Sequence, residues 1–411
     1  MTEKGKNTPT VRFKGFCDDW EQRKLDDVVS FYSGLTYTPN DVRKDGTLVL
    51  RSSNVKDGEI VSSDDVFVDS SKVNSNNVEE GDIIVVVRNG SRALIGKHAQ
   101  IKHLMSNTVI GAFMTGIRSN VPEFINAMLD TSRFKKEIDR NMGATINQIT
   151  GYMFSKMIFS VPTDDEKKKI GRFFEALDNL TALHQRQLDE QKVLKKYFLQ
   201  NMFPAKGEKI PRIRFQGFTG DWEERKLGDV ADSFEYGLNA AAKEFDGANK
   251  YIRITDIDDS THEFLQTDLT SPDTVIEQAD NYKLDEGDIL FARTGASVGK
   301  TYIYKQSDGL VYYAGFLIRA RINKKYDPEF IFQNTLTPDY DKYIRITSQR
   351  SGQPGVNAQE YADYELMIPR IDEQKRIGEF LRNLDDLITL HQRQLTQLQA
   401  IKKFMLQNFF V

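Results

Sequence analysis

The sequence predicts an α+β protein with two tandem mixed α/β domains, each followed by a long helix, and the two helices pair as an antiparallel coiled coil. Three observations predict this fold class. Residues 11–28 recur as residues 213–230, so the chain contains an internal duplication. The middle of each copy is rich in turn residues and short apolar runs. Each copy ends in a long, proline-free stretch of helical periodicity, and antiparallel pairing of these helices implies a pseudo-twofold axis.

The duplication is ordered along the chain. Trp20 and Trp222 are 222 − 20 = 202 residues apart, whereas His184 and His391 are 391 − 184 = 207 residues apart. Between these anchors, Glu-Gly-Asp-Ile at residues 80–83 recurs at 286–289. The offset grows by five residues, so two matching frames hold two different inserts.

The elements follow in the same order in each copy. Residues 82–87 and 288–292 predict strands, and residues 122–141 predict a helix. Long helices are expected over 165–201 and 372–408, after Pro162 and Pro369. A basic connector at residues 204–211 precedes the second copy. We therefore expect a first domain over residues 1–161, a helix with its connector over 162–206, a second domain over 207–368 and a C-terminal helix over 369–411.

Both long helices carry a coiled-coil seam with alternating spacings of four and three residues. The seam positions of the first helix are Ile170, Phe174, Leu177, Thr181, His184, Leu188, Gln191, Lys195 and Phe198. Those of the second are Ile377, Leu381, Leu384, Ile388, His391, Leu395, Leu398, Lys402 and Met405. The His and the Lys stand at identical places in both, which suggests that they set the register as the two helices pair with each other.

A second apolar row runs beside each seam, and a pair of helices would leave it partly exposed. We expect the mixed domains or other chains to cover this row. The predicted partner-facing residues of the helices are Phe173, Leu177, Leu180, His184, Leu188, Phe380, Leu384, Leu387, His391 and Leu395.

Composition limits the possible functions. Cys17 is the only cysteine, which excludes a disulfide framework and a cysteine-rich zinc site and suits a reducing cytosol. The five histidines show no metal-binding spacing, so no metal site is expected. The polar start and the strand-sized apolar runs predict neither a signal peptide nor a membrane span, so a cytoplasmic location is expected.

No catalytic motif stands out. Residues 295–301 (Gly-Ala-Ser-Val-Gly-Lys-Thr) suggest a phosphate-binding loop, but only three residues separate the glycines where that loop needs four. Neither an Asn-Pro-Pro-Tyr methyltransferase motif nor a helicase motif is present, and Pro272-Asp273 lacks the downstream Glu-x-Lys of a nuclease core. We therefore expect no catalytic residues in this chain.

The ordered motifs identify a family. Each half opens with Gly-Phe-x-x-x-Trp-Glu-x-Arg-Lys-Leu, continues with Glu-Gly-Asp-Ile and an Arg-containing glycine turn, and ends with a Glu-x-Lys segment leading into a Leu-rich helix. This combination resembles the specificity subunit of Type I restriction-modification enzymes over nearly the whole chain. The resemblance implies two target-recognition domains, each reading one part of a split double-stranded DNA site. It also implies two methyltransferase subunits docked on the helices and restriction-translocase subunits outside them. S-adenosylmethionine, ATP and magnesium would then be bound by those partners, and this chain would bind no cofactor.

Base readout requires polar side chains presented from loops. The candidates in the first domain are Ser52, Ser53, Asn54, Arg88, Asn89, Ser91, Arg92 and Lys97. Those in the second are Arg253, Thr255, Arg293, Thr294, Ser297, Lys300, Arg350, Ser351, Gln353 and Asn357. Trp20 and Trp222 belong to the repeated frame and are predicted to be core anchors.

Net charge leaves an alternative open. The chain carries 56 Lys and Arg against 60 Asp and Glu, a net charge of −4, which is unusual for a protein that binds nucleic acid unaided. Partner subunits could supply the missing phosphate contacts. The alternative function is a stand-alone DNA-binding regulator, which would have to bind its site without partners, and a phosphate-loop enzyme is a third, disfavoured by the loop spacing.

Overall fold

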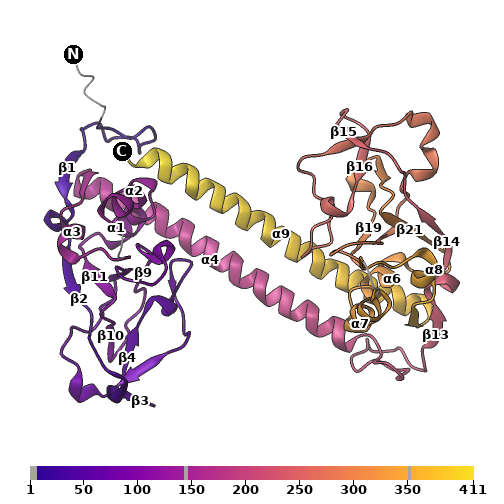
Figure 1. The fold of residues 1–411 in the computed structure, drawn as a ribbon, viewed down its shortest axis with the longest axis horizontal. Helices are drawn as coiled ribbons and strands as arrows, with labels where there is room; N and C mark the ends of the chain where they lie inside the picture. The colour runs from indigo at the N-terminus through magenta and orange to yellow at the C-terminus, as the bar shows by residue number, and fades with distance from the viewer. Residues whose placement is uncertain (1–6, 143–146, 350–352) are drawn as a thin grey trace. The chain divides into compact units, whose positions relative to one another are not determined.

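The computed structural model of the chain describes residues 7–142, 147–349 and 353–411. The chain divides into two compact units, which we call unit 1 (residues 1–183 and 395–411) and unit 2 (residues 184–394). Each unit therefore contains one mixed domain together with parts of both long helices (Figure 1). The domain boundaries expected from the sequence stay predictions. None of the helices described carries an apolar stretch of the length needed to cross a lipid bilayer.

Unit 1 contains a four-stranded antiparallel sheet in the order β2-β11-β8-β9, formed by Ser30–Ser33, Met114–Arg118, Ile83–Val86 and His98–Gln100. A second sheet has the order β10-β4-β7-β3, formed by Thr108–Ile110, Thr47–Leu50, Val66–Val68 and Val42–Arg43, and its β10 and β4 are parallel. Two small antiparallel pairs are β1 (Glu21–Lys24) with β12 (Ile158–Val161), and β5 (Val55–Lys56) with β6 (Glu59–Ile60). The predicted strand over 82–87 is confirmed as β8.

Unit 2 repeats this topology where the frames match. Its four-stranded sheet has the order β14-β21-β18-β19, formed by Ala231–Tyr236, Leu317–Ile322, Ile289–Ala292 and Thr301–Ile303. The parallel pair recurs as β16 (Lys250–Ile252) with β20 (Val311–Tyr313), and the frame pair recurs as β13 (Glu223–Lys226) with β22 (Glu365–Ile368). The inserts differ, because unit 1 joins its strands in the single sheet β10-β4-β7-β3, whereas unit 2 keeps the β16–β20 pair separate from a second pair, β15 (Ala242–Glu244) with β17 (Thr270–Pro272). The duplication read from the sequence is therefore confirmed in the topology.

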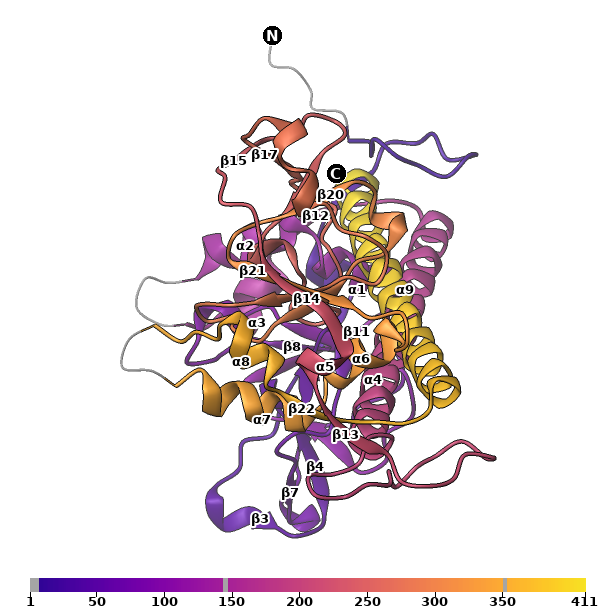
Figure 2. The same cartoon turned by 90° about the vertical axis from the view of Figure 1, so that its right-hand side faces the viewer.

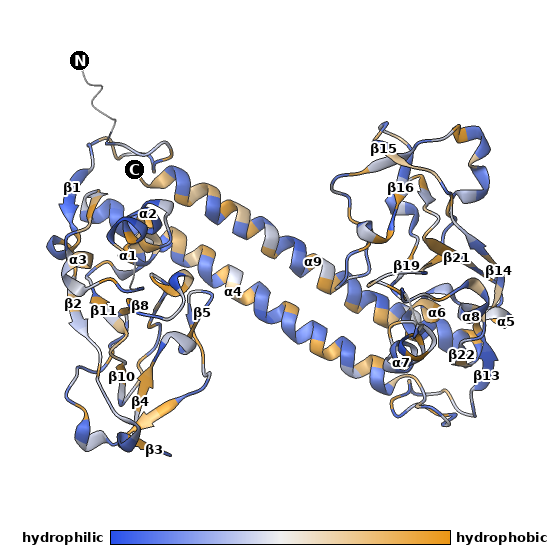
Figure 3. Ribbon diagram, in the orientation of Figure 1, coloured by the Kyte–Doolittle hydropathy of each residue, from blue (hydrophilic) through white to orange (hydrophobic). Residues whose placement is uncertain are grey.

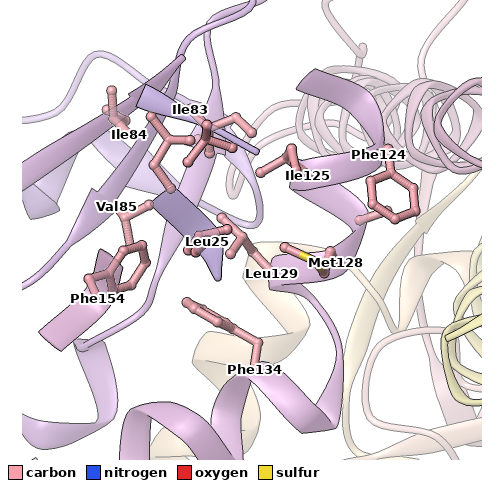
Figure 4. Close-up of a cluster of buried hydrophobic side chains, with 14 of the residues drawn as sticks. Leu25, Ile83, Ile84, Val85, Phe124, Ile125, Met128, Leu129, Phe134 and Phe154 are labelled. Carbon is pink, nitrogen blue, oxygen red and sulfur yellow. The ribbon is translucent and has the colours of Figure 1, made fainter. Parts of the chain in front are cut away.

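The core of unit 1 lies between its antiparallel sheet and a layer of helices (Figure 4). Ile83, Ile84 and Val85 of β8 are completely buried because the strand is apolar on both faces. Helix α1 (Pro122–Leu129) packs the Phe124 and Met128 side chains into the same core. Trp20 and Trp222 are 1% and 2% exposed, which confirms that both are core anchors.

The prediction of one helix over 122–141 is wrong in one respect. The segment forms two helices, α1 and α2 (Ser132–Asn141), which are separated at Asp130 and Thr131. The Thr131 hydroxyl accepts a hydrogen bond from the Phe134 backbone N–H at 3.2 Å and donates to the Met128 carbonyl at 2.7 Å. Threonine in this position caps a new helix start, so the helical path restarts there.

Helices α4 (Asp164–Asn201) and α9 (Ile371–Phe409) confirm the two predicted long helices, and hydrophobic and hydrophilic residues alternate along both of them (Figure 3). In unit 1, the Phe173 ring near the start of α4 lies 5.5 Å from the Phe409 ring at the end of α9. In unit 2, the Phe198 ring near the end of α4 lies 4.8 Å from the Phe380 ring near the start of α9. The start of one helix meets the end of the other in both units, so the predicted antiparallel pairing is confirmed within each.

Two matching ion pairs explain why the opening motif recurs. The Arg12 guanidinium donates to both carboxylate oxygens of Glu166 at 2.7 Å, and Arg214 binds Glu373 in the same way at 2.7 and 2.8 Å. Each pair ties a frame motif to the first turn of the long helix of its own half. Both glutamates are buried, and the paired carboxylate raises the pKa of each arginine. These bidentate contacts fix where each helix begins relative to its domain.

Candidate nucleic-acid interface

Most of the predicted base-reading residues lie where the strands β8 and β18 end. The backbone arrangement there is the same in both units. Ile149 N donates to Val87 O at 2.9 Å in unit 1, and Val356 N donates to Arg293 O at 2.9 Å in unit 2. Further along, Arg88 pairs with Gln148 in an isolated bridge, as Thr294 pairs with Gly355. The two candidate interfaces are therefore built on one scaffold.

Three candidates of the first domain are in direct contact. The Asn89 side-chain amide donates to the Ser52 hydroxyl at 3.1 Å, and Lys97 Nζ donates to the Ser52 carbonyl at 3.4 Å. Asn89 Oδ1 also accepts from the Ser91 backbone N–H at 2.9 Å. The loop after β8 is thus tied to the turn at Ser52–Asn54, although the two are far apart in sequence.

Four candidates of the first domain have exposed side chains. Arg88, Ser91, Arg92 and Ser53 are exposed. The Arg88 guanidinium lies over the Phe113 ring, 4.9 Å from its centre, and Arg92 lies 3.6 Å from Asp139 in an exposed ion pair. Ion pairs of this kind contribute little to stability, so these arginines can exchange their partners for phosphates or base edges.

Asn54 has a different role from the one predicted. The side chain is completely buried, and its amide donates to the Val61 and Ser63 carbonyls and to Asp65 Oδ1. Asn54 Oδ1 accepts from the Arg51 backbone N–H at 2.9 Å. All its polar capacity is used inside the fold, so the structure gives Asn54 a structural role in place of base contact.

In unit 2, Arg293 and Asn357 lie on the corresponding scaffold. The Arg293 guanidinium lies over the Tyr236 ring, 4.8 Å from its centre. Asn357 caps helix α8 (Ala358–Ala362) by accepting from the Glu360 N–H at 2.9 Å, and the Tyr236 hydroxyl accepts from the Ala358 N–H at 3.3 Å. Helix α8 packs beside β14 and α5 (Leu227–Val230), as Figure 2 shows. Tyr236, Arg293 and Asn357 are therefore brought together.

The remaining second-domain candidates divide into several groups. Thr294 and Ser297 are half-buried, and Gln353 is exposed. Thr255 is exposed, and its hydroxyl lies 3.3 Å from Asp256. Arg253 is held by both carboxylate oxygens of Asp256 at 2.8 Å, and this contact raises its pKa. Arg350 and Ser351 lie outside the described residues.

Lys300 is anchored inside the fold. Its Nζ donates to the Ile257 carbonyl at 2.9 Å and pairs with Asp259, and the side chain is only 11% exposed. Lys97 occupies the equivalent place in unit 1, because both lysines reach the turn that follows the parallel strand. Both are thus positioned to hold the two loops of each interface together.

The glycine loop before Lys300 is not a phosphate-binding loop. Backbone N–H groups in it are already used, since Gly295 N donates to Pro354 O and Gly299 N donates to Ala292 O. A strand, β19, follows the loop where phosphate binding requires a helix N-terminus. Gly299 has φ +88°, and a Cβ there would lie 2.5 Å from Ile344, so glycine is required for the turn itself.

The partner-facing residues predicted on the helices fall into three sets. Leu177, His184, Leu188, Leu384, His391 and Leu395 are buried or half-buried in the seam, and Nδ1 of His184 lies 3.2 Å from Nδ1 of His391. Phe173 and Phe380 pack against the cores of units 1 and 2. Leu180 and Leu387 are each 41% exposed, so this part of the second apolar row is open to a partner.

Sequence reasoning missed several residues of these interfaces. Phe113 and Phe316 are 53% and 65% exposed, at equivalent turns before β11 and β21. Tyr236 and Arg51 also lie beside predicted candidates. One sequence pattern could have predicted the two phenylalanines: in both halves, a small residue is followed by Phe and then by an apolar strand. Among the described residues no group of three or more His, Cys, Asp or Glu could hold a metal ion.

Comparison with known proteins agrees with this architecture. The family model of the Type I restriction modification DNA specificity domain matches twice, at residues 17–192 and 219–400. The chain is 26% identical over 410 residues to the Type I restriction enzyme EcoKI specificity subunit of Escherichia coli (strain K12), covering 90% of this chain and 82% of that protein. It is 24% identical over 425 residues to the StySPI specificity subunit of Salmonella potsdam, covering 96% and 89%.

A solved structure shares the fold. The S subunit of a Type I restriction-modification system from M. genitalium superposes with a TM-score of 0.65 at 15% identity, covering 98% of this chain and 99% of that chain. Two family domains in tandem account for the duplicated frames and the repeated sheets. The chain therefore belongs to the family of Type I restriction-modification DNA specificity proteins, as a specificity subunit and not a catalytic one.

Proposed function

We propose that the chain reads a bipartite, asymmetric site in double-stranded DNA, with each mixed domain reading one half in the major groove. The observation that carries this proposal is the pairing of identical frames with different inserts. The β2-β11-β8-β9 sheet recurs strand for strand as β14-β21-β18-β19, whereas the other four-stranded sheet of unit 1, β10-β4-β7-β3, is replaced in unit 2 by two separate pairs, β16 with β20 and β15 with β17. Equal scaffolds with unequal inserts suit two readers of unequal sequences.

The long helices would dock two methyltransferase subunits, and restriction-translocase subunits would join outside them. The exposed part of the second apolar row supports this role, because Leu180, Leu387 and Ile401 are 41%, 41% and 44% exposed on helices whose seams are already filled. S-adenosylmethionine, ATP and magnesium would be bound by those partners, which would also supply phosphate contacts that an acidic chain lacks. Such a complex acts on cellular DNA, in keeping with the cytoplasmic location expected from the sequence.

A domain exchange tests the proposal. The insert between Trp222 and Pro369 is replaced by that of a relative, and the methylated motif is determined by methylome sequencing of cells that carry the assembled methyltransferase. We expect one half of the motif to change and the other half to stay. The matched exchange between Trp20 and Pro162 should change only the opposite half. A change of both halves by either exchange contradicts the modular arrangement.

A gel-shift experiment separates this function from that of a stand-alone regulator. We expect the purified chain to bind the methylated motif weakly in moderate salt and the assembled methyltransferase to bind it tightly. Tight, sequence-specific binding by the chain alone would favour the regulator.

A further inference from the structure

An exposed phenylalanine stands at the same place in both units. Phe113 lies in the turn between β10 and β11, and Phe316 lies in the turn between β20 and β21. The same hydrogen bond closes both turns, from Met114 N to Gly111 O and from Leu317 N to Ala314 O, each at 2.8 Å. The two rings are 53% and 65% exposed.

The backbone of each phenylalanine is held although its ring is free. The Phe113 carbonyl accepts from the backbone N–H groups of Val87 at 3.0 Å and Arg88 at 3.2 Å. The Phe316 carbonyl accepts from the Arg293 N–H at 3.1 Å. Both turns are therefore fixed to the ends of the central strands β8 and β18. A ring on a backbone held in this way has only its side-chain torsions left to be ordered when it meets another surface.

An arginine adjoins each of these two turns. The Arg88 guanidinium lies over the Phe113 ring. In unit 2, the Arg293 backbone N–H donates to the Phe316 carbonyl, and the Arg293 guanidinium lies over the Tyr236 ring. An apolar protein partner would have to bury these guanidinium groups without compensation, whereas duplex DNA offers them phosphates and guanine edges. The surroundings of both rings thus favour DNA as the surface that they meet.

The edges of the bases in the major groove carry one apolar group, the 5-methyl group of thymine. We infer that Phe113 and Phe316 each contact a thymine 5-methyl group, one in each half of the site, and so act as specificity-determining residues. The inference rests on the proposed function, in which each domain reads its own half-site. It adds an apolar contact to the polar residues that the sequence indicated.

The test uses the assembled methyltransferase and a duplex that contains its methylated motif. Each thymine is replaced in turn by deoxyuridine, which removes only the methyl group, and the dissociation constant is measured. Loss of one methyl contact should weaken binding by the wild-type complex about threefold to tenfold at one position in each half. Phe113→Ala should weaken binding to thymine DNA by a similar factor and abolish the deoxyuridine effect in one half alone. Phe316→Ala should do the same in the other half.

The controls separate a base contact from a general effect. Phe113→Leu keeps an apolar side chain and should retain most of the affinity and the deoxyuridine effect. Leu104→Ala removes another exposed apolar side chain of unit 1, 75% exposed and near the opposite end of β10, and should leave both unchanged.

Several results would overturn the inference while leaving the proposed function intact. They include a half-site without a thymine, wild-type affinity of both alanine variants, and a deoxyuridine effect that persists in these variants. A rise in 2-aminopurine fluorescence beside the contacted step would show a wedge between bases and would also overturn it. Failure of the wild-type complex to prefer its motif would instead refute the proposed function.

Discussion

Lys402 of α9 forms an ion pair with Asp178 of α4 at 2.6 Å, and Lys195 of α4 forms the reciprocal ion pair with Asp385 of α9. The two pairs are equivalent, since 402 − 195 and 385 − 178 are both 207. Both lysines occupy seam positions, where a slipped register would leave a buried charge without its partner. The pairs therefore specify the antiparallel register within each unit, as a polar seam position does in other coiled coils.

Removing one member of a pair should destabilise unit 2. Lys195→Met leaves the Asp385 carboxylate, 11% exposed, without its counter-charge, and we expect a loss of about 3 kcal/mol in the free energy of unfolding. Lys195→Met combined with Asp385→Asn should recover most of it, since the asparagine can still accept from Gln333. Urea denaturation measures both. Lys226→Met at the exposed Lys226–Asp363 pair is the control and should change nothing measurable. Equal losses in the single and double variants would contradict a role of the pair itself.

Unit 2 should lose stability as the pH rises toward neutrality. Burial raises the pKa of Glu329 to about 7 from its usual 4.5, even though the Gln333 amide donates to it at 2.9 Å. The folded chain therefore holds a proton that the unfolded chain has released, and stability falls between pH 4.5 and 7. Glu329→Gln should be about 3 kcal/mol more stable than the wild type at pH 8 and equal to it at pH 4. Glu123→Gln, at the equivalent helix position of unit 1, tests for a general effect of losing the carboxylate.

The predicted base-reading residues should separate into two classes. Arg88→Ala removes an exposed side chain, so binding of the assembled methyltransferase to its motif should weaken by about fivefold or more while the melting temperature stays constant. Asn54→Ala leaves buried hydrogen-bonding groups unpaired and should lower the free energy of unfolding by about 1–3 kcal/mol. Fluorescence anisotropy and thermal denaturation distinguish the two. An Asn54→Ala variant with wild-type stability but without specific binding to the motif would show that Asn54 contacts DNA after all.

The isolated chain should not hydrolyse ATP, transfer methyl groups or cleave DNA. Lys300, the residue that a phosphate-binding loop would use, is occupied by the Ile257 carbonyl and by Asp259. Phosphate release from ATP by the purified chain should equal that of the buffer blank. Lys300→Ala should lower the free energy of unfolding and leave the rate of phosphate release unchanged. ATP turnover that disappears in a folded Lys300→Ala variant would refute this expectation.

Lengthening both helices tests whether they set the spacing of the DNA site. One added heptad in each, after Leu188 in α4 and after Leu395 in α9, keeps the seam periodicity and adds about 10 Å. We expect the methylated motif to keep both half-sequences and to gain about three base pairs of spacer. An insertion of similar length in the connector at residues 204–211 is the control and should leave the spacer unchanged. An active complex with unchanged spacing would show that another element sets this distance.

The amino-acid sequence alone determined the duplication, the strands β8 and β18, both long helices and their seams. These features depend on local periodicity and on anchors such as Trp20 and Trp222, which lie in the repeated frames and are buried in the structure. The break between α1 and α2 was not predicted, because the apolar periodicity continues through Thr131 and only its capping hydrogen bond separates the helices.

The tertiary structure alone decided which polar residues can meet DNA. In the sequence, Asn54 and Arg88 are equally suitable candidates for base contact. In the structure, the Asn54 amide donates to the Val61 and Ser63 carbonyls, whereas the Arg88 side chain is exposed beside Phe113. The partner of a polar group lies at any distance along the chain, as Lys97 and Ser52 show. Periodicity in a sequence reports which face of an element is buried, whereas hydrogen-bond satisfaction depends on contacts between elements, and these exist only once the chain has folded.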